Sequence, residues 1–177
     1  MDIINFKANS INSSTKFIFS IMNSKPLPDY LFVLIQLALF LALYFVRDNI
    51  LQQYLVSIPS SIFLTLEFLG FALSLLAVLQ LNSRISIFPS PTKDTRLITR
   101  GAYKYFRHPI YTGLILFFLG FSLASGSIFR LLLTVALFVL FNQKAKYEET
   151  LLIKVFPEYK AYMKNTWRIL PGFGKVK

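Results

Sequence analysis

The sequence contains no cysteine, 1 histidine and only 8 acidic residues among 177. Without cysteine, the chain forms no disulfide bond, carries out no thiol catalysis and builds no cysteine-ligated metal site. A single histidine with so few carboxylates also makes a protein-ligated zinc or iron site unexpected. We therefore expect no bound metal, so any chemistry has to rest on other side chains.

Polar residues are also scarce, because hydrophobic residues make up 55% of the chain and the mean hydropathy is +0.56. The apolar residues gather in four blocks, at about residues 28–46, 59–81, 109–124 and 128–141. A helix needs about 20 residues to cross a bilayer core of roughly 30 Å. The last two blocks are shorter and are separated only by Ser-Gly-Ser, which predicts a tight antiparallel hairpin. The sequence therefore predicts an all-α integral membrane protein with about four transmembrane helices and a helical cytoplasmic C-terminal tail.

Positive charge is abundant and unevenly placed, with a formal net charge of +11. The segment before the first block, the loop between the second and third blocks, and the tail are all basic. With four spans, these segments fall on one side, which the positive-inside rule makes cytoplasmic together with both termini. We expect the basic residues to set this topology and to contact anionic membrane lipids, with no role in nucleic-acid binding. A prokaryotic inner membrane is the expected location.

Three segments follow from this pattern. Residues 1–26 have scattered apolar positions, which favour a helix lying in the membrane interface. Residues 27–96 hold the first two spans and a turn-forming linker, FPSPTKD, at 88–94. Residues 97–177 hold the last two spans and the polar tail. The second span carries one acid, Glu67, which is costly in a bilayer and is expected to face the protein interior.

The histidine lies in the stretch TRGAYKYFRHPIYTG, residues 99–113, where the third block begins. Pro109 fits the first turn of a helix, which places His108 at or beside the N-cap. The free N–H groups of that turn and the charge of Arg107 attract an anionic group. Tyr111 lies three residues after His108, on a neighbouring position of one helix face. For the tyrosines, an interfacial anchor belt is an alternative interpretation.

The tail supplies carboxylates for the same region. Glu148 and Glu149 follow the fourth block by about one to two helical turns, on a continuation of its helix. Because the last two spans form a hairpin, the start of one and the end of the other are neighbours. His108 and the two glutamates can therefore face one site, although surface ion pairs with Lys144 and Lys146 are an alternative for this stretch.

These motifs resemble a known family. LITRGAYKYFRHPIYTG, the later EETLL and the final FPEYKAYMKNTWRILP are similar to segments of the isoprenylcysteine carboxyl methyltransferases and the related phospholipid methyltransferases. In that family Arg-His-Pro-x-Tyr-x-Gly, a Glu-Glu pair and a terminal segment with spaced tyrosines recur together. The similarity covers residues 97–171, whereas the first two spans match only as hydrophobic segments.

The resemblance implies a membrane methyltransferase that uses S-adenosylmethionine. The cofactor would bind on the cytoplasmic side, between the last spans and the tail, and a lipophilic acceptor would enter from the bilayer. The site residues that it implies are His108, Tyr111, Gly113, Tyr103 and Glu149 for cofactor binding, and Glu148, Glu149 and Arg107 for catalysis.

Two departures from the family pattern concern the acceptor. A proline follows Phe156 where glycine is usual, and Lys144 and Lys146 precede the glutamates in place of an arginine that helps hold a substrate carboxylate. A carboxylate acceptor is already ionised and needs a cation beside it, whereas an amine acceptor needs a base. The candidate bases are Glu148, Glu149, Glu67 and His108. The acceptor and the oligomeric state stay open.

Two other functions fit the same residues. Membrane sterol reductases resemble this family over the C-terminal region and use NADPH, although they are normally longer and have more spans. A non-catalytic membrane assembly protein would use the His-Pro and Glu-Glu elements only to brace the hairpin. It would bind no cofactor, which separates it from both enzymes.

Overall fold

The computed structural model describes residues 26–55, 57–81, 88–91, 97–172 and 174–175. The predicted interfacial segment therefore lies outside the described residues, except for its last residue. The described elements are α2 (Leu27–Phe45), α3 (Gln52–Leu55), α4 (Ser60–Leu81), the 3₁₀ helix η2 (Gly101–Lys104), α5 (Pro109–Ala124), α6 (Ile128–Val155) and α7 (Tyr159–Asn165). Within these residues one isolated β-bridge joins Phe106 to Trp167.

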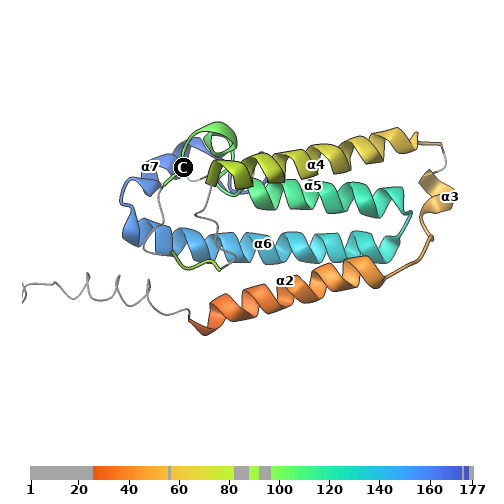
Figure 1. Ribbon diagram of the computed structural model, residues 1–177, viewed down its shortest axis with the longest axis horizontal. Helices are drawn as coiled ribbons and strands as arrows, with labels where there is room; N and C mark the ends of the chain where they lie inside the picture. Colours follow the sequence, from red (N-terminus) through yellow and green to blue (C-terminus); the bar gives the residue numbers. More distant parts are fainter. Residues whose placement is uncertain (1–25, 56, 82–87, 92–96, 173, 176–177) are drawn as a thin grey trace, which may run out of the picture.

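The four long helices lie side by side (Figure 1). α4 packs along α5, α5 along α6, and α6 along α2. Three of them, α2, α4 and α6, are long and apolar enough to cross a membrane, and α5 is a shorter apolar helix of 16 residues. At 1.5 Å per residue α5 is about 24 Å long, less than the roughly 30 Å of a bilayer core. The all-α membrane architecture is confirmed, whereas four spans and cytoplasmic termini stay predictions.

The predicted hairpin between α5 and α6 is present. Gly126 adopts a φ of +62°, a conformation that favours glycine because it has no Cβ. Ser127 is the N-cap of α6, and its hydroxyl accepts a hydrogen bond from the Arg130 N–H at 3.1 Å. Asp48, from the connection after α2, accepts another from the Ile128 N–H at 3.0 Å. The first N–H groups of α6 are thus bound by its own N-cap, Ser127, and by Asp48 of a neighbouring connection.

Glycines allow α4 and α5 to approach closely. A Cβ added to Gly113 would lie 2.5 Å from the carbonyl oxygen of Gly70, and one added to Gly120 would lie 2.7 Å from the carbonyl oxygen of Phe63. Real Cβ atoms do not come so near to backbone. The half-buried Glu67 is at the same contact, with its Cγ 2.8 Å from a Cβ on Gly120. Glu67 therefore lies against α5, as expected for an acid within a span.

α6 connects the core to the polar end of the molecule. With 28 residues it is about 42 Å long, which exceeds the bilayer core by about 12 Å. Its apolar part, residues 128–141, ends at the fully buried Phe141, which packs in the core with Leu43 and Ile115. Its polar part, residues 142–155, carries Glu148 and Glu149, so the predicted helical continuation is confirmed.

The polar end of α6 lies beside several other chain segments. Figure 1 shows η2, α7 and the C-terminal region gathered where α4 ends and α5 begins. The predicted division into residues 27–96 and 97–177 stays a prediction, and the packing of α4 on α5 crosses it.

Candidate active site

The part of the chain that follows α6, which is called the tail from here on, is bonded to the segment that precedes α5. The Arg107 N–H donates to the Trp167 carbonyl at 2.8 Å, and the His108 N–H donates to the Arg168 carbonyl at 3.1 Å. In return the Trp167 N–H donates to the Tyr105 carbonyl at 3.0 Å. These bonds place the end of the tail directly against the predicted site, so both segments contribute to its walls.

His108 occupies the predicted N-cap of α5, and Pro109 follows it in the first turn. The His108 side chain is 6% exposed, and its ring stacks on that of Tyr111 with a centroid distance of 5.3 Å and an interplanar angle of 2°. Nδ1 lies 3.6 Å from Glu148 Oε2, and Nε2 lies 3.5 Å from Glu149 Oε1. The predicted meeting of the histidine with both glutamates is therefore confirmed.

Glu149 is buried among cations. Its Oε1 is 2.7 Å from Arg107 Nε, its Oε2 is 2.9 Å from Arg168 Nε, and its side chain is 3% exposed. Burial opposes ionisation, but the charge of His108 and the hydrogen bond and charge of Arg107 outweigh it and lower the pKa of Glu149 to about 2. A carboxylate with so low a pKa is a weak base. Its contacts suit a positioning role.

Glu148 has a different environment. Its side chain is 27% exposed, and Tyr111 donates a hydrogen bond to its Oε2 at 3.3 Å. Burial raises the pKa of Glu148, although the charges of His108 and Lys144 oppose that shift. Of the two neighbouring glutamates, Glu148 is therefore the stronger proton acceptor and the one that faces open space.

Arg107 is engaged by the tail. Besides its ion pair with Glu149, its Nη1 donates to the carbonyl oxygens of Met163, at 3.1 Å, and Thr166, and its Nη2 donates to that of Gly174 at 2.6 Å. The Arg107 side chain has no exposed surface. A guanidinium bound to three tail carbonyls holds the tail in place, so its geometry supports positioning more than contact with a substrate.

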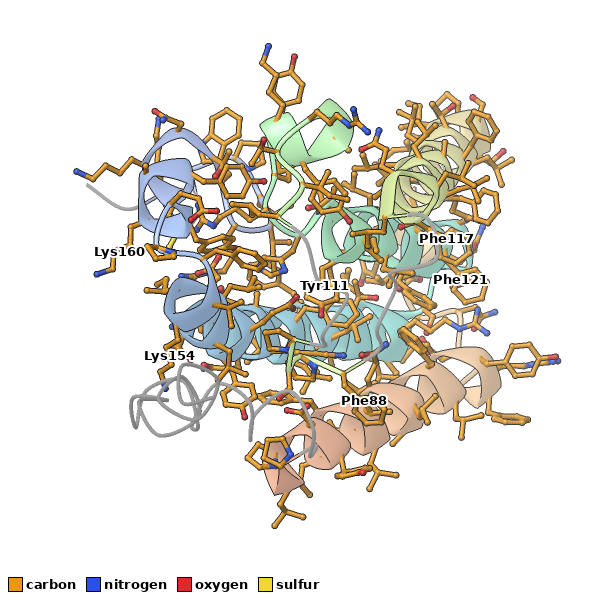
Figure 2. All side chains as sticks on the ribbon, turned by 60° about the vertical axis from the view of Figure 1, so that its left-hand side comes forward. Phe88, Tyr111, Phe117, Phe121, Lys154 and Lys160 are labelled. Atoms are coloured by element: carbon orange, nitrogen blue, oxygen red, sulfur yellow. The ribbon has the colours of Figure 1, made fainter. Side chains whose placement is uncertain are left out.

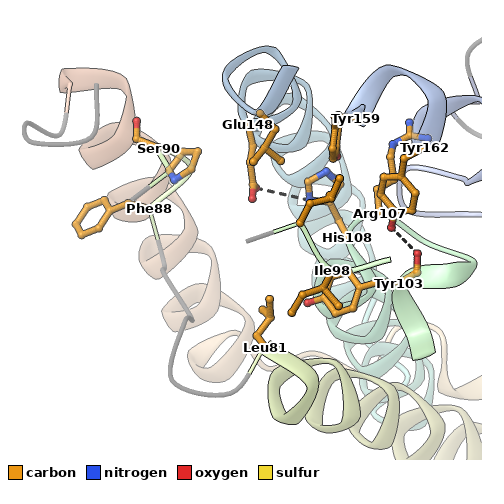
Figure 3. Close-up of a pocket in the computed structure, with 13 residues that line it drawn as sticks. Leu81, Phe88, Ser90, Ile98, Tyr103, Arg107, His108, Glu148, Tyr159 and Tyr162 are labelled. Atoms are coloured by element: carbon orange, nitrogen blue, oxygen red, sulfur yellow. Dashed lines mark hydrogen bonds and ion pairs between the residues drawn. The ribbon is translucent and has the colours of Figure 1, made fainter. Parts of the chain in front are cut away.

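Tyr103 lies in η2 and is 8% exposed. Its carbonyl accepts a hydrogen bond from the Tyr162 hydroxyl of α7 (Figure 3). Burial, and then the charge of Glu148, raise the pKa of Tyr103 well above its ordinary value, so this phenol stays protonated. The sequence did not single out Tyr159, Tyr162 or Arg168 as individual site residues. The spacing of the tyrosines in the terminal segment was the signal for the first two, whereas no spacing pattern pointed to Arg168.

Two neighbouring cavities meet at these residues. The first, of about 120 Å³, is covered by the tail (Figure 3). Its lining includes Leu81, Phe88, Ser90, Leu97, Ile98, Tyr103, Arg107, His108, Glu148, Leu152, Tyr159 and Tyr162. The second, of about 190 Å³, lies among the long helices. Its lining includes Gln36, Val78, Leu81, Tyr103, Arg107, His108, Ile110, Tyr111, Leu114, Lys144 and Glu148.

Two predicted site residues, Glu149 and Gly113, line neither cavity. Glu149 still contacts His108 and Arg107, which line both, whereas Gly113 lies at the contact between α4 and α5. A Cβ there would meet Ser74 and the backbone of Gly70 in α4. The position packs two helices together, and its assignment to cofactor binding stays a prediction.

Comparisons with known proteins agree with this fold. A solved structure of a eukaryotic intramembrane Ras methyltransferase, an isoprenylcysteine carboxyl methyltransferase, superposes with a TM-score of 0.62 and 22% identity, over 92% of this chain and 65% of that one. A protein-S-isoprenylcysteine O-methyltransferase of Schizosaccharomyces pombe is 36% identical over 75 residues, which are 41% of this chain and 32% of the relative. The chain thus spans less than two thirds of the length of either protein. Residues 63–159, more than half of the chain, match the phospholipid methyltransferase family. The protein therefore belongs to the phospholipid methyltransferase family of integral membrane proteins.

Proposed function

We propose that this protein is a membrane methyltransferase that binds S-adenosylmethionine in the tail-covered cavity and a lipophilic acceptor in the helix-lined cavity. One observation carries the proposal: both cavities are lined by Leu81, Tyr103, Arg107, His108 and Glu148. Two ligands that occupy them would meet at this common wall, and aligning two reactants is the main requirement of a group transfer. Family membership supports a methyl group as the group transferred and favours this function over the reductase alternative.

The lining of the tail-covered cavity suits the cofactor. The aromatic faces of Tyr103, Tyr159 and Tyr162 suit a sulfonium cation, and the Glu148 carboxylate suits an ammonium or ribose hydroxyl group. Apolar side chains such as Ile98 and Leu152 suit a flat, weakly polar base. When bound, S-adenosylmethionine supplies an electrophilic methyl carbon on a positively charged sulfur.

The residues around this cavity have separate roles in the proposal. Glu148 binds a polar group of the cofactor, or accepts a proton if the acceptor arrives protonated, because its pKa is raised and its side chain is accessible. His108 is held by its stacking on Tyr111 and its contacts with both glutamates, so it presents a fixed surface. Glu149 and Arg107 position these groups and the tail. The tail excludes water, which strengthens the electrostatic interactions inside the cavity.

The helix-lined cavity supports an acceptor with an anionic head group. Lys144 is 1% exposed, and its Nζ donates to Gln36 Oε1 at 2.7 Å. The remaining lining is largely apolar, with Val78, Ile110 and Leu114 suited to a hydrocarbon chain. A buried cation in an apolar cavity favours a carboxylate, which is also the kind of group that an O-methyltransferase methylates.

A transfer assay tests the proposal. Purified protein is incubated with S-adenosylmethionine labelled with tritium on the methyl group, and with vesicles of total membrane lipid that contain an S-farnesylated cysteine. We expect label in the organic extract that alkali releases as methanol, because a methyl ester is base-labile. Label that resists alkali would point to an amine acceptor, and no label with folded protein would overturn the proposal.

A further inference from the structure

One wall of the tail-covered cavity comes from the connection between α4 and η2. Phe88, Pro89 and Ser90 line the cavity, and Figure 3 shows Phe88 and Ser90 beside α2, across from Glu148 and His108. These residues belong to the FPSP stretch, residues 88–91, a turn-forming sequence with no regular hydrogen-bonded structure of its own. Its position therefore depends on contacts with other elements.

α2 provides such contacts. Asp29, in the first turn of α2, has no exposed surface, and its Oδ2 accepts a hydrogen bond from the Ser90 N–H at 3.2 Å. The ring of Tyr30 meets that of Phe88 edge-on at 5.3 Å, and Figure 2 shows Phe88 against α2. A charged acceptor for a buried backbone N–H is among the stronger hydrogen bonds in proteins.

The polar part of α6 completes the junction. Burial, and then the charge of the nearby Asp29, raise the pKa of the Tyr147 hydroxyl. The ring of Tyr147 packs on Phe32 of α2 at 5.8 Å. Asp29 thus joins α2 to the FPSP stretch at a buried point where α2 also packs on α6, although it does not line the cavity itself.

We propose that Asp29 is a positioning residue that holds the FPSP stretch in place as one wall of the cofactor cavity. α2 lies outside residues 63–159, which carry the family match. On this proposal α2 nevertheless contributes to cofactor affinity. A wall that is already in place lowers the entropic cost of binding a ligand. Loss of Asp29 should therefore weaken ligand binding, although Asp29 does not line the cavity. The proposal rests on the proposed function.

The first test measures the wall itself, without a ligand. Because the chain has no cysteine, Ser90→Cys introduces one thiol at a position that is 1% exposed. We expect slow maleimide labelling of this thiol, and labelling about tenfold faster once Asp29→Ala removes the charged acceptor. Asp29→Asn keeps an oxygen acceptor for the Ser90 N–H and should restore slow labelling. Equal rates with aspartate and alanine would overturn the proposal.

The second test measures S-adenosylhomocysteine binding by calorimetry. We expect Asp29→Ala to weaken binding about tenfold, and Asp29→Asn to stay close to the parent protein. Asp48→Ala is the matched control, because it removes another carboxylate that accepts a backbone N–H, at the opposite end of α6. Equal weakening by Asp48→Ala, or unchanged affinity in Asp29→Ala, would overturn the positioning role. If the parent protein binds no S-adenosylhomocysteine, the proposed function fails, and the role of Asp29 in cofactor binding fails with it. The labelling rates still show whether Asp29 holds the FPSP stretch in place.

Discussion

Glu149 holds the tail on the helices, and Glu149→Gln should release it. Its carboxylate pairs with Arg107 and Arg168 and is 3% exposed. Burial opposes its ionisation, yet His108 and Arg107 lower its pKa from an ordinary 4.5 to about 2. That difference corresponds to about 3 kcal/mol of stabilisation at neutral pH. Removing one partner of a buried ion pair costs a similar amount, about 3–5 kcal/mol.

The pH dependence of this stabilisation has a definite sign. Because the pKa of Glu149 is lower in the folded protein than in the unfolded chain, the stabilisation is fully present above a pH of about 4.5. It is lost as the pH falls through about 2. The difference in unfolding free energy between the parent and Glu149→Gln should thus be about 3 kcal/mol at neutral pH and shrink in acid.

The single tryptophan provides the assay. Trp167 lies in the tail, pairs with the segment before α5, and has its ring 6.0 Å from that of Phe106. Its fluorescence during urea unfolding in detergent therefore reports the docked tail. Glu158→Gln, at an exposed position of the tail, is the control and should change stability by less than about 0.5 kcal/mol. A loss of unfolding free energy below about 1 kcal/mol for Glu149→Gln, or a loss independent of pH, would show that Glu149 does not hold the tail.

Three further substitutions address the packing and the two cavities. Gly120→Leu should separate α4 from α5, because a Cβ at this position would lie 2.7 Å from the Phe63 carbonyl oxygen. Size-exclusion chromatography should then show a smaller monodisperse fraction than for the parent protein. Lys144→Met should reduce kcat/KM for an anionic acceptor while S-adenosylhomocysteine affinity stays the same, since Lys144 lines only the helix-lined cavity of the two described. Tyr162→Phe should weaken S-adenosylhomocysteine binding about fivefold in calorimetry, because it removes the hydroxyl that donates to the Tyr103 carbonyl.

Much of the site follows from local sequence signals. Pro109 fixes the start of α5 and makes His108 its N-cap, and Ser-Gly-Ser closes the hairpin that brings Glu148 and Glu149 back to this point. Each of these steps depends on a residue type with a strong backbone preference or on helical periodicity. The meeting of the histidine and the two glutamates could therefore be predicted from the sequence.

The tail and the FPSP wall could not be predicted in the same way. Arg107 binds backbone carbonyls of the tail, and Asp29 binds a backbone N–H. Every residue except proline offers both groups, so the pattern of side chains does not identify such partners. Gly113 has a packing role that the motif alone did not indicate. Its spacing of seven from Gly120 is typical of helix packing, and both positions face α4, while its assignment to cofactor binding stays a prediction.

On the proposed function, the cavity under the tail binds S-adenosylmethionine through His108 and Glu148. Calorimetry with S-adenosylhomocysteine on detergent-purified protein measures this binding, with His108→Ala and Glu148→Ala as variants and the exposed Glu158→Ala as the control. NADPH serves as the competing ligand. We expect saturable binding by the parent and the control, and lost or strongly weakened binding in both site variants. Folded protein that binds no S-adenosylhomocysteine, or that binds NADPH in its place, would rule out this cofactor site.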